Sequence, residues 1–395
     1  MVIHHTSDIG GGSISFIDVL DMLKDKHEII AYYPECSNNN LVKYAEERGH
    51  NINSINIPIP LFNYYSGCSG IFSRGFWNGI INLKYRKELE NFIKKQNPDI
   101  VIVNSSVMVF LGHIIKKCNV KSICYVRETF VEKKNLRTKF MKYMLDNWFD
   151  GVIFLSEYDR NFAGLKKAKT KVIRDCINPS EKIIKLREDA CKDLNIDHNK
   201  FNILYLGGVN WIKGIDLALK SLLYSDDDVN LILAGKIKFD SSKKRSIRKI
   251  IRILINSKGL KYEKSVKKLL GKREIRNRVK EIGLCTDISK AYMATDLVIF
   301  PSKVPHQARP IFEAGLYKKT IIISNFNQTK EYLIDNFNGR TFLANNYKDL
   351  AEKIKNLKFD KELCKRLGEN NYRLTIEKHN ILIEKLKFNN FINEF

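Results

Sequence analysis

Short apolar runs rich in β-branched residues alternate with segments of helical length along most of this 395-residue chain. In the first half the expected strands are Val2–His4, Glu28–Tyr33, Ile100–Asn104, Ser122–Val126, Val152–Leu155 and Lys171–Arg174. Helical patterns such as Ser15–Lys24 and Tyr85–Lys95 lie between them. Strands separated by helix-length segments form parallel sheets that helices cover on both faces. The alternation therefore predicts an α/β fold.

The alternation pauses in the middle of the chain and then resumes. The polar stretch from Asn178 to Asn199 has no strand pattern, and a second series begins at Phe201. Its expected strands are Asn202–Leu206, Leu231–Ala234, Leu297–Phe300 and Thr320–Ser324, and its expected helices are Ile215–Tyr224, Ile288–Ala294 and Ile311–Tyr317. A chain of this length exceeds one ordinary core. We expect an N-terminal domain at 1–180, a linker at 181–200, a second domain at 201–370 and a helical tail at 371–395.

Much of the net charge of +24 lies in one segment. Residues 236–280 hold 18 Lys or Arg and three acidic residues, a surplus of 15 positive charges that attracts anionic partners. Apolar residues from Ile247 to Ile255 recur there at helical spacing, which fits a basic amphipathic helix on an anionic membrane surface or a solvated helix packed on the domain. The aromatic stretch Leu61–Trp77 fits contact with a lipid-linked acceptor or a packed surface loop.

The sequence predicts neither a membrane-spanning segment nor a secretion signal. Its N-terminus has a strand pattern rather than a basic start with an apolar stretch. The eight cysteines are scattered and none forms a C-x-x-C pair, which indicates neither a zinc site nor a disulfide framework. We expect a cytoplasmic protein. Peripheral attachment to the inner face of the cell membrane is compatible with that location.

Two glycine-rich loops lie between an expected strand and an expected helix. In the first, Gly11, Gly12 and Ser13 would let the backbone approach a ligand beside free N–H groups of a helix, although a flexible loop explains them equally well. The second runs from Gly207 to Gly214 and contains Lys213, whose charge suits a diphosphate. An exposed lysine before a helix is the alternative.

The strongest motif joins the buried strand that ends at Pro301-Ser302 to the stretch from Pro305 to Gly315. Arg309 suits phosphate oxygens, and the two oxygens of Glu313 suit both hydroxyls of a ribose. We expect the helix of this motif to open near Glu313. A favourable charge in the first turn of a helix is the alternative explanation for that residue.

From about residue 203 to 342 the chain resembles glycosyltransferase family 4, the retaining enzymes of GT-B fold. The matching pieces are Gly207-Gly208, Lys213-Gly214, Ile282-Gly283, Ala294-Thr-Asp296, Pro301-Ser302, Arg309-Pro310, Glu313-Ala314, Ser324-Asn325, Lys330-Glu331 and Asn338-Gly339. The N-terminal half resembles the family more weakly, through the first glycine-rich loop and Val152–Glu157. The resemblance implies two Rossmann-like domains that face each other across a cleft, with a C-terminal helix that returns to the N-terminal domain.

The resemblance also implies a reaction and a donor site. A sugar would move from a nucleotide-diphosphate sugar, UDP favoured over GDP, to a glycan or lipid-linked acceptor during capsule or O-antigen assembly, with no metal required. The residues implied in catalysis are Lys213, His306, Arg309 and Glu313. The residues implied in donor binding are Gly11, Gly12, Ser13, Gly208, Lys213, Gly283, Leu284, Gln307, Ala308, Arg309 and Glu313. We interpret Asp226–Asp228 as a solvated turn rather than a metal motif.

Three positions depart from the family pattern. Pro305 stands where the family has a first glutamate, Gly208 where it has an arginine, and Arg127 where it has a histidine of the catalytic cleft. Two alternatives therefore stay open. One is a nucleic-acid-binding protein that uses residues 236–280, although the chain contains no recognised motif of that class. The other is a GT-B relative without transferase activity.

Overall fold

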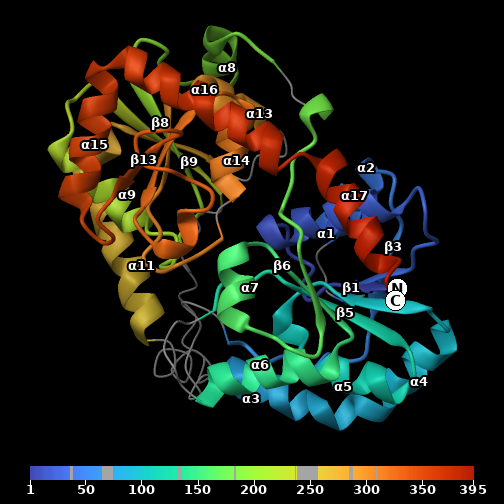
Figure 1. Cartoon of the computed structure of the whole chain (residues 1–395). Coiled ribbons are helices and arrows are strands. Elements are labelled where there is room, and N and C mark those ends of the chain that lie inside the picture. Colours follow the sequence, from blue (N-terminus) through green and yellow to red (C-terminus); the bar gives the residue numbers. More distant parts are fainter. Residues whose placement is uncertain are drawn as a thin grey trace. The chain divides into compact units, whose positions relative to one another are not determined.

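A computed structural model describes residues 1–35, 39–64, 74–130, 136–181, 184–235, 237, 257–283, 288–307 and 309–395. The chain forms two compact units (Figure 1). Unit 1 consists of Met1–Cys176 and His379–Phe395, and unit 2 consists of Ile177–Lys378. In the described part of the chain no helix is long and apolar enough to span a bilayer.

Unit 1 contains a parallel sheet in the order β3-β2-β1-β4-β5-β6-β7. Its strands are β1 (Val2–Ile3), β2 (Ala31–Pro34), β3 (Ile52–Ile55), β4 (Ile100–Val103), β5 (Lys121–Val126), β6 (Gly151–Phe154) and β7 (Lys169–Val172). Its helices are α1 (Gly11–Leu23), α2 (Asn40–Glu47), α3 (Arg74–Ile81), α4 (Arg86–Gln96), α5 (Phe110–Lys117), α6 (Leu136–Trp148), α7 (Glu157–Ala163) and α17 (Ile381–Ile392).

Both faces of this sheet are buried. Val101 and Val103 of β4 point into a core shared with α4, α5 and α6, whereas Ile102 points into a second core with α1, α2 and α17. Side chains alternate between the faces of a strand, so a strand covered on both sides consists of apolar residues throughout. This explains why the run Ile100–Val103 could be predicted as a buried strand.

Helix α17 brings the C-terminus of the chain back to unit 1, where it lies beside α1 (Figure 1). The Asn389 side chain donates a hydrogen bond to the Met22 carbonyl over 2.9 Å, and its Oδ1 lies 3.1 Å from His27 Nε2. Phe388 is fully buried against Tyr125. The predicted return of a C-terminal helix to the N-terminal domain is confirmed.

Unit 2 contains a second parallel sheet, in the order β10-β9-β8-β11-β12-β13. Its strands are β8 (Phe201–Leu206), β9 (Val229–Ala234), β10 (Val279–Gly283), β11 (Leu297–Phe300), β12 (Thr320–Ser324) and β13 (Arg340–Phe342). Its helices are α8 (Arg187–Asp193), α9 (Ile215–Ser221), α11 (Ser257–Leu270), α12 (Arg273–Arg276), α13 (Ser289–Ala294), α14 (Arg309–Leu316), α15 (Tyr347–Phe359) and α16 (Lys361–Lys378). Two Rossmann-like sheets of one chain confirm the predicted fold class.

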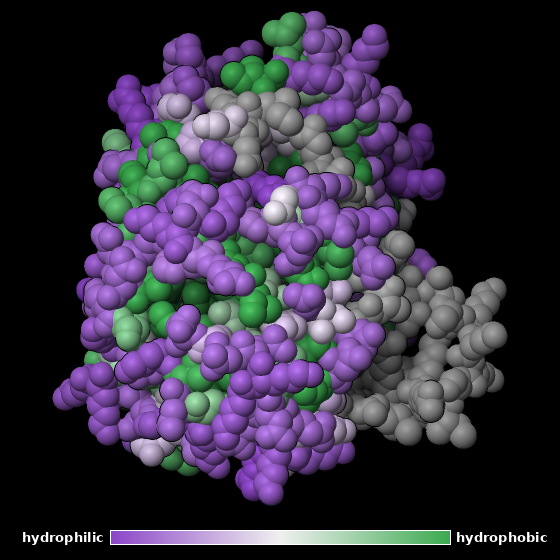
Figure 2. All heavy atoms as spheres, turned by 90° about the vertical axis from the view of Figure 1, so that its right-hand side faces the viewer, coloured by the Kyte–Doolittle hydropathy of each residue, from purple (hydrophilic) through white to green (hydrophobic). Residues whose placement is uncertain are grey.

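The described part of the basic segment packs on unit 2 through one side of α11. Val266 is fully buried, whereas the neighbouring lysines Lys264, Lys267 and Lys268 are exposed. The amphipathic pattern from Ile247 to Ile255 lies outside the described residues. Figure 2 shows a face of the molecule on which hydrophilic side chains predominate and separate the hydrophobic patches.

Candidate functional site

The strand order of unit 2 creates a divergence between two neighbouring strands. Strand β8 pairs with β9 on one side and with β11 on the other. The strand order reverses between β8 and β11. In open α/β sheets, the loops that follow the two strands at such a reversal turn to opposite faces of the sheet, and ligands bind in the crevice between these loops. The loop after β8 carries Lys213. The chain after β11 carries His306 and leads into α14, which holds Arg309 and Glu313.

These two loops are held against each other by close backbone contacts. Gly214 has φ +69°, and a Cβ at this position would lie 2.0 Å from the Pro301 carbonyl oxygen. The Lys303 N–H donates a hydrogen bond to the Ile212 carbonyl over 2.8 Å. The Lys303 ammonium also forms an ion pair with the buried Asp216 of α9 at 2.7 Å. The position of Lys213, one residue before Gly214, is therefore fixed by the fold.

Lys213 is half-buried, and its aliphatic stem packs on the Gly207 backbone. A Cβ at Gly207 would lie 2.6 Å from Lys213 Cδ, so a larger residue would displace the lysine. Burial lowers the pKa of Lys213, and the negative charge of Glu313 opposes that fall. Among the described residues the ammonium has no hydrogen-bond or ion-pair partner. A positive charge held in this way favours an anionic ligand.

Glu313 receives hydrogen bonds from two side chains of unit 2. The Tyr292 hydroxyl donates to one carboxylate oxygen over 2.9 Å, and Arg309 Nε donates to the other over 3.0 Å. Burial raises the pKa of Tyr292, and the neighbouring Glu313 charge raises it further, so Tyr292 stays a donor. Because a carboxylate accepts about four hydrogen bonds, Glu313 retains acceptor capacity for two ligand hydroxyls.

The helix expected at Ile311–Tyr317 is present, but it begins at Arg309 rather than near Glu313. Helix α14 begins at Arg309, with Pro310 in its first turn, where proline has no N–H to lose. Glu313 is therefore in the second turn, which excludes a first-turn charge as the reason for its presence. Arg309 stands at the positive end of the helix dipole, an unfavourable place for a cation unless an anion is nearby.

His306 lies near Lys213 in the loop after β11. Its ring stacks on Phe300 with centroids 6.0 Å apart. Burial, and then the charge of Lys213, lower the pKa of His306 to about 4. The imidazole is therefore neutral at pH 7, and it offers one N–H donor and one acceptor nitrogen to a ligand.

Glycines line the carboxyl ends of β8, β9 and β10. The Gly235 N–H donates to the Gly283 carbonyl over 2.7 Å, and a Cβ at Gly235 would lie 2.8 Å from the Gly208 nitrogen. Gly208 and Gly283 have φ values of +59° and +70°. Of the other predicted residues, Gln307 is half-buried in the same loop as His306, whereas Leu284 and Ala308 lie outside the described residues.

Tyr292 and Gly235 also belong to this arrangement, and neither is among the residues predicted from the sequence. Tyr292 lies on α13, 21 residues before its partner Glu313, and no local pattern indicates that pairing. Gly235 directly follows β9, and a glycine at the carboxyl end of a parallel strand was a signal that could have been used.

Unit 1 has its own divergence, between β1 and β4. Of the predicted residues there, Gly11 and Gly12 begin α1, and the Ser13 hydroxyl is buried. Ser13 Oγ donates to the Asp8 carbonyl over 2.5 Å and lies 3.2 Å from Nε2 of the fully buried His4. The Ser13 side chain therefore stabilises its own loop.

Arg127, which stands where the family has a histidine, is held by unit 1. Its guanidinium forms an ion pair with Asp175 at 2.6 Å, donates to Asn104 Oδ1 over 2.8 Å and covers the Tyr125 ring. The next residue, Glu128, accepts a hydrogen bond from the Ser106 N–H over 2.9 Å. These contacts assign Arg127 a role in holding β5 and the loop after β4.

Among the described residues no group of three or more His, Cys, Asp or Glu side chains has the arrangement of a metal site. The acidic turn Asp226–Asp228 precedes β9 and is occupied by cations of the protein. Lys358 forms ion pairs with Asp226 and Asp228, and Arg278 lies 3.4 Å from Asp227.

The chain matches one protein-family model in sequence and many solved structures in fold. Residues 187–374, just under half of the chain, match the family model described as "Glycosyl transferases group 1". No curated protein matches the chain in sequence.

Three solved structures illustrate the similarity in fold. HepE from Anabaena, in complex with UDP and glucose, has a TM-score of 0.79 and 16% identity over 100% of this chain and 99% of that one. A glycosyltransferase from Rickettsia africae has a TM-score of 0.71 and 19% identity, and the similarity covers 100% of this chain and 97% of that one. Sucrose-phosphate synthase from Thermosynechococcus elongatus has a TM-score of 0.75 and 16% identity over 100% of this chain and 98% of that one. The chain therefore has the GT-B fold, and its residues 187–374 match the glycosyl transferases of group 1.

Proposed function

We propose that the protein is a glycosyltransferase that moves a sugar from a nucleotide-diphosphate sugar to a glycan or lipid-linked acceptor. One observation carries the proposal. Lys213, whose ammonium has no partner among the described residues, comes together with the Arg309–Glu313 pair at the divergence of the sheet in unit 2, inside the segment that matches group 1 transferases. UDP is the favoured nucleotide, because structures of similar fold hold UDP and UDP-glucose.

In this proposal Glu313 accepts the two ribose hydroxyls of the donor while Tyr292 and Arg309 hold its carboxylate in place. The glycine backbone at Gly208 and Gly283, together with Leu284, borders the base. Lys213 and Arg309 neutralise the diphosphate, and the N–H groups and side chains from His306 to Ala308 lie against the donor sugar.

The transfer step needs stabilisation of negative charge on the leaving diphosphate. Lys213, Arg309 and the N-terminus of α14 are positive groups that the fold positions in advance, which is the most effective form of electrostatic catalysis. We propose that they replace a metal ion in this role. Retention of the anomeric configuration would follow if the acceptor attacks the face that the diphosphate leaves, with a phosphate oxygen as base.

In this proposal unit 1 binds the acceptor. Gly11 and Gly12 of unit 1 would also contact the diphosphate of the donor. We propose a lipid-linked or polymeric acceptor of surface polysaccharide assembly, such as capsule or O-antigen, handled at the cytoplasmic face of the membrane. Attraction to anionic lipid is supported by exposed basic residues of α11, of α12 and of the turn between them, which are Lys261, Lys264, Lys267, Lys268, Lys272, Arg273 and Arg276.

A thermal-shift experiment tests the donor site. UDP, GDP, ADP and their sugar conjugates are compared on wild type, Glu313→Ala and the matched control Glu352→Ala, which removes an exposed carboxylate of α15. A ligand that binds only the folded state raises the melting temperature. We expect UDP to stabilise the wild type and the control but not Glu313→Ala. Equal stabilisation of all three proteins would refute the assignment of Glu313.

Two other functions give different experimental results. Pro305 favours the first, because the proline removes a carboxylate that the family resemblance places near the donor sugar, and the basic residues at 236–280 favour the second. A GT-B protein without transferase activity would bind the nucleotide without turnover. A nucleic-acid-binding protein would instead bind DNA or RNA with strong salt dependence and show no response to UDP. The thermal-shift experiment and a turnover assay separate these outcomes.

A further inference from the structure

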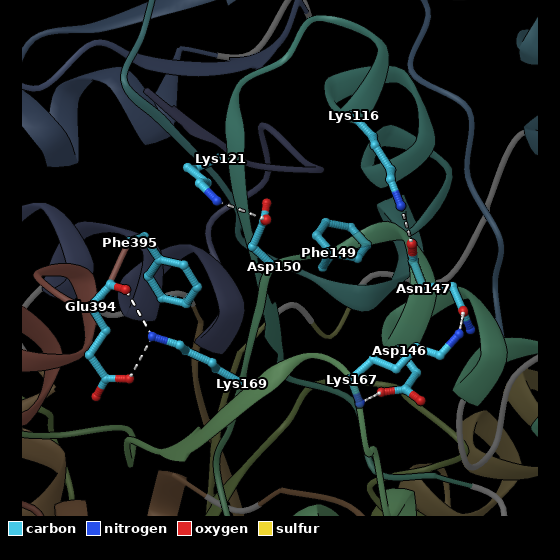
Figure 3. A pocket seen from close by; sticks show the side chains of 10 residues that line it. All are labelled: Lys116, Lys121, Asp146, Asn147, Phe149, Asp150, Lys167, Lys169, Glu394 and Phe395. Atoms are coloured by element: carbon cyan, nitrogen blue, oxygen red, sulfur yellow. Dashed lines mark hydrogen bonds and ion pairs between the residues drawn. The ribbon is translucent and has the colours of Figure 1, made fainter.

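A cavity of about 450 Å³ lies in unit 1, and none of the residues that line it belongs to the candidate donor site. It opens at the amino edge of the sheet, where β5, β6 and β7 begin (Figure 3). The residues that line it are Lys116, Lys121, Asp146, Asn147, Phe149, Asp150, Lys167, Lys169, Glu394 and Phe395. Ligand pockets in proteins commonly measure about 300–1,000 Å³, so the cavity has room for a single sugar unit.

Two phenylalanine rings form fixed walls of this cavity, and each rests on a glycine. A Cβ at Gly112 of α5 would lie 2.5 Å from the Phe149 ring, and a Cβ at Gly151 of β6 would lie 2.5 Å from the Phe395 ring. Phe149 is buried and Phe395 is half-buried, so Phe395 offers part of its ring to the cavity. Figure 3 shows the Phe149 ring in the middle of the group of lining side chains.

The four lysines are only partly neutralised by the protein. Lys116 donates to the Asn147 carbonyl over 3.0 Å, and Lys167 donates to the Asn147 side-chain oxygen over 2.7 Å, so the hydrogen-bond partners of both ammonium groups are neutral. Although burial opposes it, main-chain hydrogen bonds and the charge of Lys167 also lower the pKa of the nearby Asp146 carboxyl group. Lys121 lies 3.5 Å from Asp150, and Lys169 lies 3.5 Å from the Glu394 carboxylate. An ammonium has three protons to donate, so Lys116 and Lys167 retain donors for an anion.

Two of the lining carboxylates are engaged by the main chain. One Asp146 oxygen accepts hydrogen bonds from the N–H groups of Lys166, Lys167 and Ala168 at 2.7–3.2 Å. One Asp150 oxygen accepts from the Ser122 N–H over 2.9 Å. These bonds hold the loops in position and leave Asp150 and Glu394 each with an oxygen that can accept a hydroxyl proton of a ligand.

We propose that this cavity binds an anionic saccharide, meaning a sugar unit that carries a phosphate or a carboxylate group. Lys116 and Lys167 take the anionic group, Asp150 and Glu394 accept hydrogen bonds from hydroxyls, and the apolar face of the sugar ring lies against Phe395. The inference does not depend on the proposed transfer reaction, because the cavity shares no residue with the donor site.

The test measures binding of glucose 6-phosphate, glucuronate, glucose and inorganic phosphate by titration calorimetry at low ionic strength. The variant Lys116→Gln/Lys167→Gln removes the two cations with neutral partners. The control Lys117→Gln/Lys166→Gln removes two exposed lysines one position away, which do not line the cavity. The melting temperature reports whether each variant is folded.

Wild type and control should bind glucose 6-phosphate or glucuronate. The Lys116→Gln/Lys167→Gln variant should bind these sugars at least about tenfold more weakly, because the loss of one hydrogen bond from a charged group reduces affinity by about that factor. Three results would overturn the proposal. They are no binding of either anionic sugar, an equal loss in the control pair, and inorganic phosphate binding as tightly as glucose 6-phosphate. A protein that passes this test but ignores UDP would refute the proposed function alone.

Discussion

Two glycines of unit 2 have almost the same backbone conformation but different surroundings, and their replacement by alanine separates two physical costs. Gly214 has φ +69° and Gly283 has φ +70°. An added Cβ at Gly214 would lie 2.0 Å from the Pro301 carbonyl oxygen, whereas at Gly283 no atom of the described residues lies within 4 Å. The first substitution therefore adds strain and a backbone clash, and the second adds strain alone.

The expected losses in the free energy of unfolding follow from these contacts. A left-handed conformation costs alanine about 1 kcal/mol relative to glycine, which is the whole effect expected for Gly283→Ala. Overpacking adds about 1–3 kcal/mol, because the Pro301 carbonyl belongs to the backbone and has little freedom to move, so Gly214→Ala should lose about 2–4 kcal/mol.

The assay follows the unfolding of unit 2 in denaturant through Trp211, the only tryptophan of that unit. Replacing Trp77 and Trp148 by phenylalanine removes the signal of unit 1. Gly214→Ala should also weaken UDP binding, because Lys213 directly precedes the displaced residue. Equal losses of stability for Gly214→Ala and Gly283→Ala would refute the argument that the contact with Pro301 fixes the loop.

Three further predictions concern single side chains. Tyr292→Phe removes the hydroxyl that holds Glu313 and should weaken UDP binding about tenfold in calorimetry, since a hydrogen bond to a charged group contributes about 1.5–3 kcal/mol. The His306 ring, with its pKa lowered from 6.5 to about 4, is neutral at pH 7, so NMR should show it titrating near pH 4. Because the unfolded chain takes up that proton first, the stability of the wild type should fall as pH drops from 6.5 to 4, and His306→Gln should lose less over that interval. Phe388→Ala should destabilise unit 1 by about 3–5 kcal/mol in denaturant, because the ring is fully buried between α17 and the sheet.

Matched variants control for general damage. Tyr224→Phe changes a tyrosine that is 51% exposed, and it should leave UDP binding unchanged. Leu386→Ala shortens a side chain of α17 that is 60% exposed, and its effect should stay within about 0.5 kcal/mol. If either control matched the effect of its partner variant, the contact named for that partner would not be the cause.

The central strands could be predicted because they are buried on both faces. Ile100–Val103 and Leu297–Phe300 are apolar throughout, so their pattern is visible without any tertiary information. The strands that were missed lie nearer the edges of the sheets and lack that pattern. β3 contains the exposed Asn53 and Ser54, and β13 has only three residues.

The candidate site was only partly predictable for a related reason. Lys213, Arg309 and Glu313 stand in local motifs that a strand–loop–helix pattern makes visible. Tyr292 was missed because its hydroxyl meets Glu313 only once α13 and α14 pack on the same sheet. The start of α14 at Arg309 could have been predicted, since Pro310 is typical of a first helical turn.

The most direct test of the proposed reaction is the release of nucleoside diphosphate, with water taking the sugar in place of the acceptor, from UDP-glucose, UDP-galactose, UDP-N-acetylglucosamine and GDP-mannose. Wild type, Lys213→Gln and the control Lys361→Gln, an exposed lysine of α16, are compared. We expect wild type and control to release UDP from a UDP-sugar and Lys213→Gln to lose about 100-fold in kcat/KM, the scale of one lost charge-stabilising contact. Release of no nucleotide from any donor, or equal turnover in all three proteins, would contradict a donor site built around Lys213.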